Sequence, residues 1–254
     1  MTPDDYPPRS LLYVPGSNAR ALEKAGGLAA DMLIIDLEDA VPADRKIEAR
    51  AAMRAAVIAG FAGKRVAVRV NATGTAGQAD DIAALDGLTL DAVVLPKVDA
   101  PSDLDPLRGL GLPILAMIET PAAIYAARDI AADPAVAGLI AGLNDLAHEL
   151  KLPDGMDRGA MSHAIQAIVL AARVGGVWGF DGVYNAIDDA AGFAAEAAEG
   201  RRLGFDGKTL IHPSQVDPCN SAFAPSEREI AAAEALVAAA TGGAQRHDGR
   251  MIED

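Results

Sequence analysis

The sequence predicts a single-domain α/β protein, a (β/α)8 barrel with a short C-terminal helical extension. The chain has 254 residues, and about 250 residues close one such barrel. Eight short runs rich in Val, Ile and Leu alternate with Ala-rich amphipathic stretches, which indicates a parallel sheet with helices packed on it. No linker or low-complexity tract divides the chain, so we expect a barrel over 1–224 and a C-terminal helix and tail over 225–254.

The predicted strands are short, and several are apolar on both faces, as parallel strands buried on both sides are. In chain order they cover residues 10–14, 32–36, 65–70, 91–95, 113–118, 137–141, 177–184 and 207–211.

The predicted helices lie between these strands and carry recognisable start and stop signals. They cover residues 18–30, 44–60, 77–86, 102–109, 121–132, 158–174 and 188–203, with a further helix at 226–240. Start signals are Ser17, Asn18, Pro121, Asp188 and Asp189, and Gly175–Gly176 ends the sixth helix. We expect the last residues, from 243 on, to form an exposed tail.

The composition excludes several classes of protein. The formal net charge of −14 argues against a nucleic-acid partner, because phosphate binding needs a basic surface. A single cysteine, Cys219, permits no intrachain disulfide, which is consistent with the cytoplasm. The acidic, Pro-rich start does not resemble a signal peptide, and no apolar run is long enough to span a membrane. We find no GxGxxG, P-loop or GxSxG motif.

Polar side chains follow almost every predicted strand, at the end where barrel enzymes place their catalytic groups. From the second strand to the eighth they include Asp36, Glu38, Asp39, Arg69, Asn71, Lys97, Glu119, Thr120, Asn144, Asp145, Asp181, Asn185, His212 and Ser214. Unpaired buried charges are costly, so this convergence indicates a metal or substrate that neutralises them. The alternative, that polar residues merely begin loops, suffices for one strand but not for all eight.

The acids at this rim suit a magnesium ion. Glu119 and Asp145 follow adjacent strands, with Asp36, Glu38 and Asp39 across the rim. Mg²⁺ prefers oxygen ligands and usually takes one or two carboxylates while keeping several waters. No His or Cys set has the spacing of a zinc site.

Arg69 would face these acids from the end of the third strand. Its planar guanidinium suits a carboxylate or a developing enolate oxygen, and a metal with an arginine is the apparatus for stabilising an enolate. The alternative is an ion pair that only neutralises Asp36 or Glu38. We interpret His148, His163 and His247 as surface or packing residues, whereas His212 could be catalytic or a loop anchor.

The turn Pro15-Gly16-Ser17-Asn18 opens a helix, and such a turn can hold a phosphate or carboxylate. On this feature alone, a plain turn is the simpler interpretation.

Taken in order, the motifs RSLLYVPGSNARALEKA, DMLIIDLEDAVPADRK, VAVRVN, VVLPKV, MIETPAAI, GLNDLA and GFDGKTLIHPSQV resemble the citrate lyase β-subunit-like branch of the HpcH/HpaI aldolase/citrate lyase family. The resemblance covers nearly the whole chain, from about residue 9.

This resemblance implies a magnesium-dependent carbon–carbon lyase that cleaves or forms 3-hydroxyacyl thioesters such as citryl-, malyl- or citramalyl-CoA. By motif, Glu119 and Asp145 would be the metal ligands, and Arg69 would bind the substrate carboxylate or thioester oxygen. The backbone at Glu119 and Thr120 would cradle the keto acid. Residues expected to hold metal-bound waters are Asp36, Glu38 and Asp39, and those expected to contact CoA phosphates are Arg20 and Lys24. The family also implies a homo-oligomer, a trimer or hexamer.

Two departures from the family bear on the reaction. The pyruvate-aldolase branch has a histidine where this chain has Asp39, which favours the citrate lyase-like branch. Malyl-CoA-type lyases continue beyond the position of Asp254 with a segment that supplies an acid to a neighbouring subunit, so the proton donor is unassigned here. Two alternatives therefore stay open: a malyl-CoA-type thioesterase, and a β subunit that acts only within a citrate lyase complex on a carrier-protein thioester.

Overall fold

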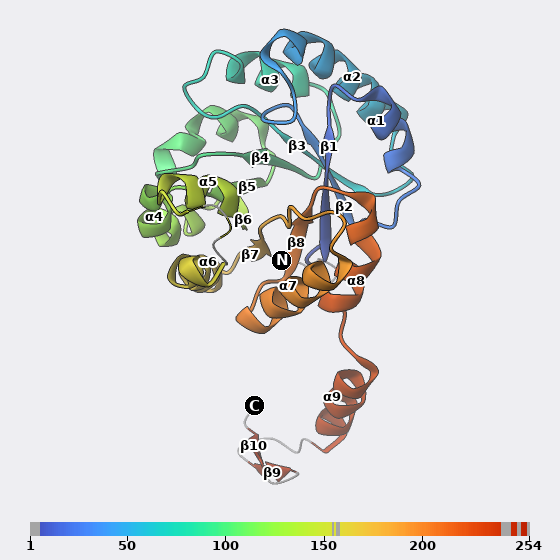
Figure 1. Cartoon of the computed structure of the whole chain (residues 1–254), viewed down its shortest axis with the longest axis vertical. Coiled ribbons are helices and arrows are strands. Elements are labelled where there is room, and N and C mark those ends of the chain that lie inside the picture. The colour runs from blue at the N-terminus through green and yellow to red at the C-terminus, as the bar shows by residue number, and fades with distance from the viewer. Residues whose placement is uncertain (1–5, 154, 156–157, 240–244, 248–249, 253–254) are drawn as a thin grey trace. The chain divides into compact units, whose positions relative to one another are not determined.

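The computed structural model describes residues 6–153, 155, 158–239, 245–247 and 250–252. Among these residues, eight parallel strands close into a barrel in the order β1 to β8, with β1 hydrogen-bonded to both β2 and β8 (Figure 1). The predicted (β/α)8 barrel is confirmed. The strands are β1 Ser10–Pro15, β2 Met32–Asp36, β3 Arg65–Arg69, β4 Ala92–Leu95, β5 Ile114–Ile118, β6 Val136–Ala141, β7 Trp178–Asp181 and β8 Gly207–Leu210.

Helices connect the strands, as the alternating pattern predicts. The α-helices of the barrel are α1 Ala19–Ala25, α2 Lys46–Ala59, α3 Gln78–Leu85, α4 Pro121–Ala131, α5 Leu143–Glu149, α6 Ser162–Gly175, α7 Ala190–Leu203 and α8 Val216–Phe223. The 3-10 segments are η1 Ala43–Arg45, η2 Pro101–Leu110, η3 Arg158–Met161 and η4 Pro213–Gln215. Asn18, Thr120 and Asp189 cap α1, α4 and α7 through their side chains, because a cap oxygen satisfies a free N–H of the first turn.

Three connections differ from the sequence prediction. The segment predicted as a helix at 102–109 is the 3-10 segment η2, whose internal Pro106 cannot donate a backbone hydrogen bond. Helices α5 and α8 are absent from the prediction, because seven or eight residues carry too little of the helical repeat to be recognised.

The residues fall into two compact units, 1–223 and 224–254. The second contains α9 Glu227–Ala239 and a hairpin of β9 Gln245–His247 with β10 Arg250–Ile252. The hairpin lies within the segment predicted as an exposed tail. The predicted exposure concerns side chains that the structure does not describe. No helix of the described chain is long and apolar enough to cross a bilayer.

Two apolar layers follow from the alternation of side chains along each strand. On β2, Leu33 and Ile35 face the helices, whereas Met32 and Ile34 face the inside of the barrel. The inner layer is filled by Leu11, Met32, Ile34, Ala67, Ala92, Val94, Leu115, Met117, Ile140 and Phe180. The next inward-facing position at the carboxyl end of each strand is therefore free to line a cavity.

Candidate active site

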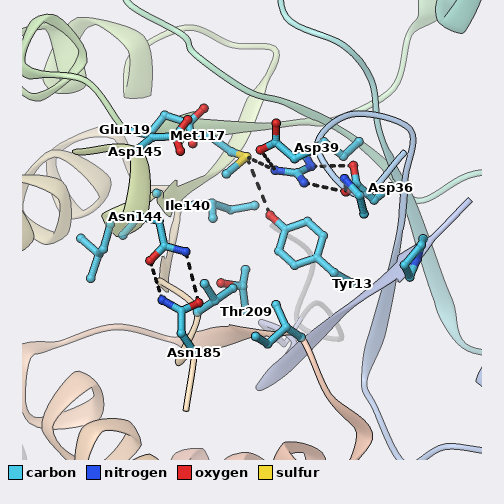
Figure 2. Close-up of a pocket in the computed structure, with 18 residues that line it drawn as sticks. Tyr13, Asp36, Asp39, Met117, Glu119, Ile140, Asn144, Asp145, Asn185 and Thr209 are labelled. Carbon is cyan, nitrogen blue, oxygen red and sulfur yellow. Dashed lines mark hydrogen bonds and ion pairs between the residues drawn. The ribbon is translucent and has the colours of Figure 1, made fainter. Parts of the chain in front are cut away.

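A cavity of about 380 Å³ opens at the carboxyl ends of the strands, above the inner apolar layer (Figure 2). Side chains alternate between the inside and the outside of the barrel along each strand, and Tyr13, Asp36, Arg69 and Thr209 occupy inward positions. These four residues line the cavity. Its other polar lining residues are Asp39, Glu119, Asn144, Asp145 and Asn185. The predicted residues Arg69, Glu119 and Asp145 thus share one cavity.

Arg69 is held in place by Asp36. Its Nε and Nη2 donate to the two carboxylate oxygens of Asp36 at 2.7 and 2.6 Å. Asp36 also accepts the backbone N–H groups of Glu38 and Ala40 at 2.8 and 3.0 Å. Both side chains are nearly fully buried. This bidentate geometry fixes the plane of the guanidinium and leaves Nη1 directed at the cavity.

Glu38 and Asp39 lie on the open side of Arg69. Its Nη1 is 3.1 Å from Oε2 of Glu38 and 3.7 Å from Oδ2 of Asp39. Glu38 Oε2 is buried and has no hydrogen bond of good geometry among the described residues. Burial raises the pKa of Glu38 to about 7, although Arg69 opposes the shift. An acid in this state is available to a further donor, such as a water.

Glu119 is buried at the end of β5. Its Oε1 accepts the backbone N–H of Lys97 at 2.7 Å, and Lys97 adopts the left-handed conformation, with φ of 54°. A non-glycine residue in that conformation is strained, and such strain gathers at functional sites. Gly142 lies so close that a Cβ atom there would stand 2.3 Å from the Glu119 side chain. Burial raises the pKa of Glu119 to about 7, and nearby Asp145 and Glu38 add to the shift.

Asp145 lies in the first turn of α5, beside Glu119 (Figure 2). The ammonium of Lys97 is 3.7 Å from Asp145 and 3.6 Å from Glu38. The net effect of these carboxylates is to raise the pKa of Lys97, although its burial opposes them. Lys97 therefore compensates part of the negative charge that Glu119 and Asp145 concentrate at this point.

This donor set fits a divalent cation that keeps part of its water shell. Two acids, Glu119 and Asp145, meet in the cavity, and the buried oxygen of Glu38 lacks a good partner. No group of three or more His, Cys, Asp or Glu residues suited to a metal occurs in the described part of the chain. Two carboxylates completed by waters or substrate oxygens suit Mg²⁺, whereas a structural zinc site would need four protein ligands.

The rest of the cavity lining is uncharged. Asn144 and Asn185 exchange hydrogen bonds of 3.2 and 2.7 Å between their side-chain amides, and this pair joins α5 to the loop after β7 (Figure 2). Thr209 donates to the carbonyl of Asp181 at 2.9 Å. Met117, Ile140 and Ile211 supply apolar surface. The cavity lining therefore combines acids with uncharged polar and apolar side chains.

A second cavity of about 410 Å³ lies beside the first. Arg20 and Lys24, both exposed on α1, line it with His212. His212 caps η4 and its Nδ1 lies 2.8 Å from Ser214 Oγ, so it anchors this loop. Gly16 donates its N–H to the backbone carbonyl of Asp36 at 2.8 Å, so this N–H of the Pro15-Gly16-Ser17-Asn18 turn already has a partner within the protein.

Several predicted rim residues lie outside the cavity lining. Asn71 is one of them: its side chain accepts from Lys46 Nζ at 2.9 Å, and its backbone N–H donates to Asp81 at 2.8 Å. Thr120 is outside the cavity lining, because its hydroxyl caps α4 and donates to Asp99. The prediction that Asp181 faces the rim is wrong. Phe180 faces inward, so Asp181 points outward. There it belongs to a buried group of charges that we call the wall cluster, consisting of Arg158, Asp181, Glu196, Glu199 and Lys208.

Three residues of this site have a specific role that the sequence alone does not predict. Lys97 follows the fourth strand in the sequence, but only the fold brings its ammonium close to both Glu38 and Asp145. Gly142 shows no special φ, and only its closeness to Glu119 explains it. Tyr13 lies within an apolar strand, and its inward position follows from alternation with buried Leu11.

The comparisons with known proteins agree with this geometry. Residues 9–213 match the family HpcH/HpaI aldolase/citrate lyase. The chain is 44% identical to a (3S)-malyl-CoA thioesterase of Cereibacter sphaeroides, over all of this chain and 92% of the relative. It is 32% identical to citrate lyase subunit beta of Leuconostoc mesenteroides subsp. cremoris, over 95% and 85%.

Solved structures show the same likeness. CitE from Mycobacterium tuberculosis, in complex with magnesium, acetoacetate and coenzyme A, superposes with a TM-score of 0.84 at 33% identity, covering 97% of this chain and 93% of that one. A citrate lyase beta subunit from M. tuberculosis, complexed with oxaloacetate and magnesium, gives 0.78 at 34% identity, covering 86% and 97%.

The closed barrel, with acids and an arginine at its carboxyl rim, has the arrangement of a barrel enzyme. The chain belongs to the HpcH/HpaI aldolase/citrate lyase family and resembles its citrate lyase β-subunit-like members.

Proposed function

We propose that this protein is a magnesium-dependent lyase that cleaves, or forms, the carbon–carbon bond of a 3-hydroxyacyl thioester such as malyl-, citramalyl- or citryl-CoA. The observation that carries the proposal is the meeting of Glu119, Asp145 and Arg69 in one cavity. Relatives crystallised with magnesium, keto acids and coenzyme A support it.

Glu119 and Asp145 would hold the metal, and Glu38 and Asp39 would hold waters bound to it. When bound, the ion would polarise the hydroxyl or keto oxygen of the substrate and offset the charge of the two acids. The orphaned oxygen of Glu38 is suited to this role, since it is already buried beside the guanidinium.

Arg69 would stabilise negative charge on the substrate, because Asp36 fixes its guanidinium plane. The substrate hydroxyl gives up its proton, and the adjoining carbon–carbon bond breaks. The hydroxyl carbon becomes the carbonyl of the keto acid, and the electron pair of the broken bond moves into the thioester enolate. The enolate takes up one proton at carbon, so the reaction is balanced. The backbone at Thr120 stays a candidate for holding the keto acid.

Arg20 and Lys24 would bind phosphates of the CoA moiety along the second cavity. Their positive charge is needed because the whole chain is strongly acidic.

A second candidate is hydrolysis of the thioester, with release of the hydroxy acid and free thiol. The 44% identity to a (3S)-malyl-CoA thioesterase over the whole chain favours it. The same metal and arginine would then stabilise the oxyanion formed by water attack on the thioester carbonyl.

The decisive experiment incubates purified protein and Mg²⁺ with malyl-, β-methylmalyl-, citramalyl- and citryl-CoA, and measures keto acid and free thiol together. A lyase produces keto acid and acyl-CoA without free thiol. A thioesterase produces free thiol and the intact hydroxy acid. Turnover of free CoA esters would also show that the protein does not need a citrate lyase complex for activity. If neither the CoA esters nor a carrier-protein thioester were turned over, the proposal would be refuted.

The homo-oligomer implied by the family, a trimer or hexamer, and a cytoplasmic location are also proposals. Light scattering coupled to size-exclusion chromatography tests the first, and cell fractionation tests the second.

A further inference from the structure

Tyr13 stands on the wall between the two cavities. It lines the acidic cavity of Glu119 and Asp145 and also the second cavity of Arg20 and Lys24. If the acyl part of a substrate occupies the first cavity and its CoA part the second, the thioester linking them must pass this wall. The inference below therefore rests on the proposed function, specifically on a thioester substrate.

The hydroxyl of Tyr13 points across the acidic cavity toward Met117 (Figure 2). Its one hydrogen bond in the described structure is to the thioether sulfur of Met117, at 3.7 Å. A thioether is a weak acceptor, whereas a tyrosine hydroxyl in a protein interior usually has a good partner. The hydroxyl can therefore turn to a stronger acceptor, such as a substrate oxygen, at little cost.

Arg69 strengthens this hydroxyl as a donor. The guanidinium carbon lies 4.8 Å from the centre of the Tyr13 ring, in the range of a cation–π contact. A cation over the ring withdraws electron density and makes the O–H group more polar. Burial raises the pKa of Tyr13 well above its usual value, and Arg69 only partly opposes this. The hydroxyl thus stays protonated at neutral pH and acts as a donor.

We propose that Tyr13 is a catalytic hydrogen-bond donor, whose hydroxyl binds the thioester oxygen while that oxygen gains negative charge. No proton is transferred: the O–H bond of Tyr13 stays intact, and the hydrogen bond stabilises the oxyanion. In the lyase reaction this oxygen belongs to the enolate, and in hydrolysis to the tetrahedral intermediate. The inference therefore holds for either outcome of the proposed function.

Tyr13→Phe tests it, because phenylalanine keeps the ring against Arg69 and removes only the hydroxyl. Loss of one oxyanion donor lowers kcat by about 100-fold, while KM and calorimetric affinity for Mg²⁺ with a keto acid stay near wild type. Tyr125→Phe is the matched control, since Tyr125 is 87% exposed on α4. Circular dichroism and thermal unfolding confirm that both variants fold.

A second measurement isolates enolate formation in a lyase. Wild-type protein, with Mg²⁺ and a bound keto acid, should exchange the α-hydrogens of acetyl-CoA for deuterium in D₂O, and Tyr13→Phe should exchange them far more slowly. If the wild type is active and Tyr13→Phe has the same kcat, the inference is overturned. A substitution that changes only KM would overturn it as well. A wild type inactive on every thioester would refute the proposed function itself.

Discussion

Two groups of charged side chains occupy opposite faces of the barrel wall, and they differ in how their charges are compensated. We call the group inside the mouth the rim cluster; it consists of Asp36, Glu38, Asp39, Arg69, Lys97, Glu119 and Asp145. The wall cluster lies outside the strands, between β7, β8 and α7. The rim holds five acids against two bases, and the wall three acids against two.

In the wall cluster every fully buried charge has several partners. Lys208 is completely buried and donates to Asp181 at 3.0 Å, to Glu196 at 2.8 Å and to the carbonyl of Gly182. Arg158 also donates to the Asp181 carboxylate from both terminal nitrogens, at 3.0 and 3.1 Å. Gly200 lets α7 approach, since a Cβ there would lie 2.6 Å from Asp181. These contacts join β7, β8, α7 and η3.

The rim cluster is instead left unbalanced. Burial raises the pKa values of Glu38 and Glu119 to about 7, which means that their ionised forms are disfavoured in the fold. Such unfavourable burial is expected where a ligand is to bind. One atom in each cluster, Glu38 Oε2 at the rim and Arg158 Nε in the wall, lacks a good hydrogen bond. The clusters therefore differ in the excess of acid and in the raised carboxyl pKa values, and these two features mark the rim as a site.

The largest expected effect is on activity at the rim. Glu119→Gln removes one of the two acids proposed to hold the metal, so turnover should fall by more than about 1000-fold. Because the ionised acid is disfavoured in the fold, the metal-free variant should unfold at an unchanged or higher temperature. Steady-state kinetics, calorimetric Mg²⁺ titration and thermal unfolding measure these effects. Glu149→Gln, on the exposed end of α5, is the control; wild-type activity in Glu119→Gln would refute the metal assignment.

The next effect is on stability at the wall. Lys208→Met leaves Asp181 short of a partner in a fully buried place, so the free energy of unfolding should fall by about 3–5 kcal/mol. Urea denaturation measures it. In wild type the Lys97 side chain is 46% exposed, and its ammonium lies 3.6–3.7 Å from its carboxylates. The matched variant Lys97→Met should therefore lose at most about 1 kcal/mol. Equal losses for the two lysines would remove the distinction between the clusters.

The smallest effect is the pH dependence of the metal-free protein. Between pH 4.5 and about 7, folded Glu38 and Glu119 hold protons that the unfolded chain has released. Lowering the pH from 8 to 6 should therefore stabilise the fold, by about 1–2 kcal/mol. Urea denaturation in EDTA at both pH values measures this. In Glu119→Gln this gain in stability should be smaller. If the same pH change destabilised the wild type, the raised pKa values of Glu38 and Glu119 would be wrong.

The sequence predicted much of the fold and part of the site. The Val- and Ile-rich runs place all eight strands to within a few residues, because burial on both faces leaves a strong local signal. The rim position of Arg69, Glu119 and Asp145 followed from their place after strands. The sequence did not predict short helices such as α5, because seven residues contain too few repeats of the apolar pattern to be recognised.

What the sequence by itself determined is therefore the barrel and the chemical types gathered at its carboxyl end, since both follow from local patterns repeated along the chain. Only the tertiary structure decided which polar residues face one another. It turned Asp181 and Lys208 outward, set Gly142 against Glu119 and placed Tyr13 under Arg69. The physical reason is that strand alternation, close packing and charge pairing join residues far apart in the chain, and no local pattern records those distances.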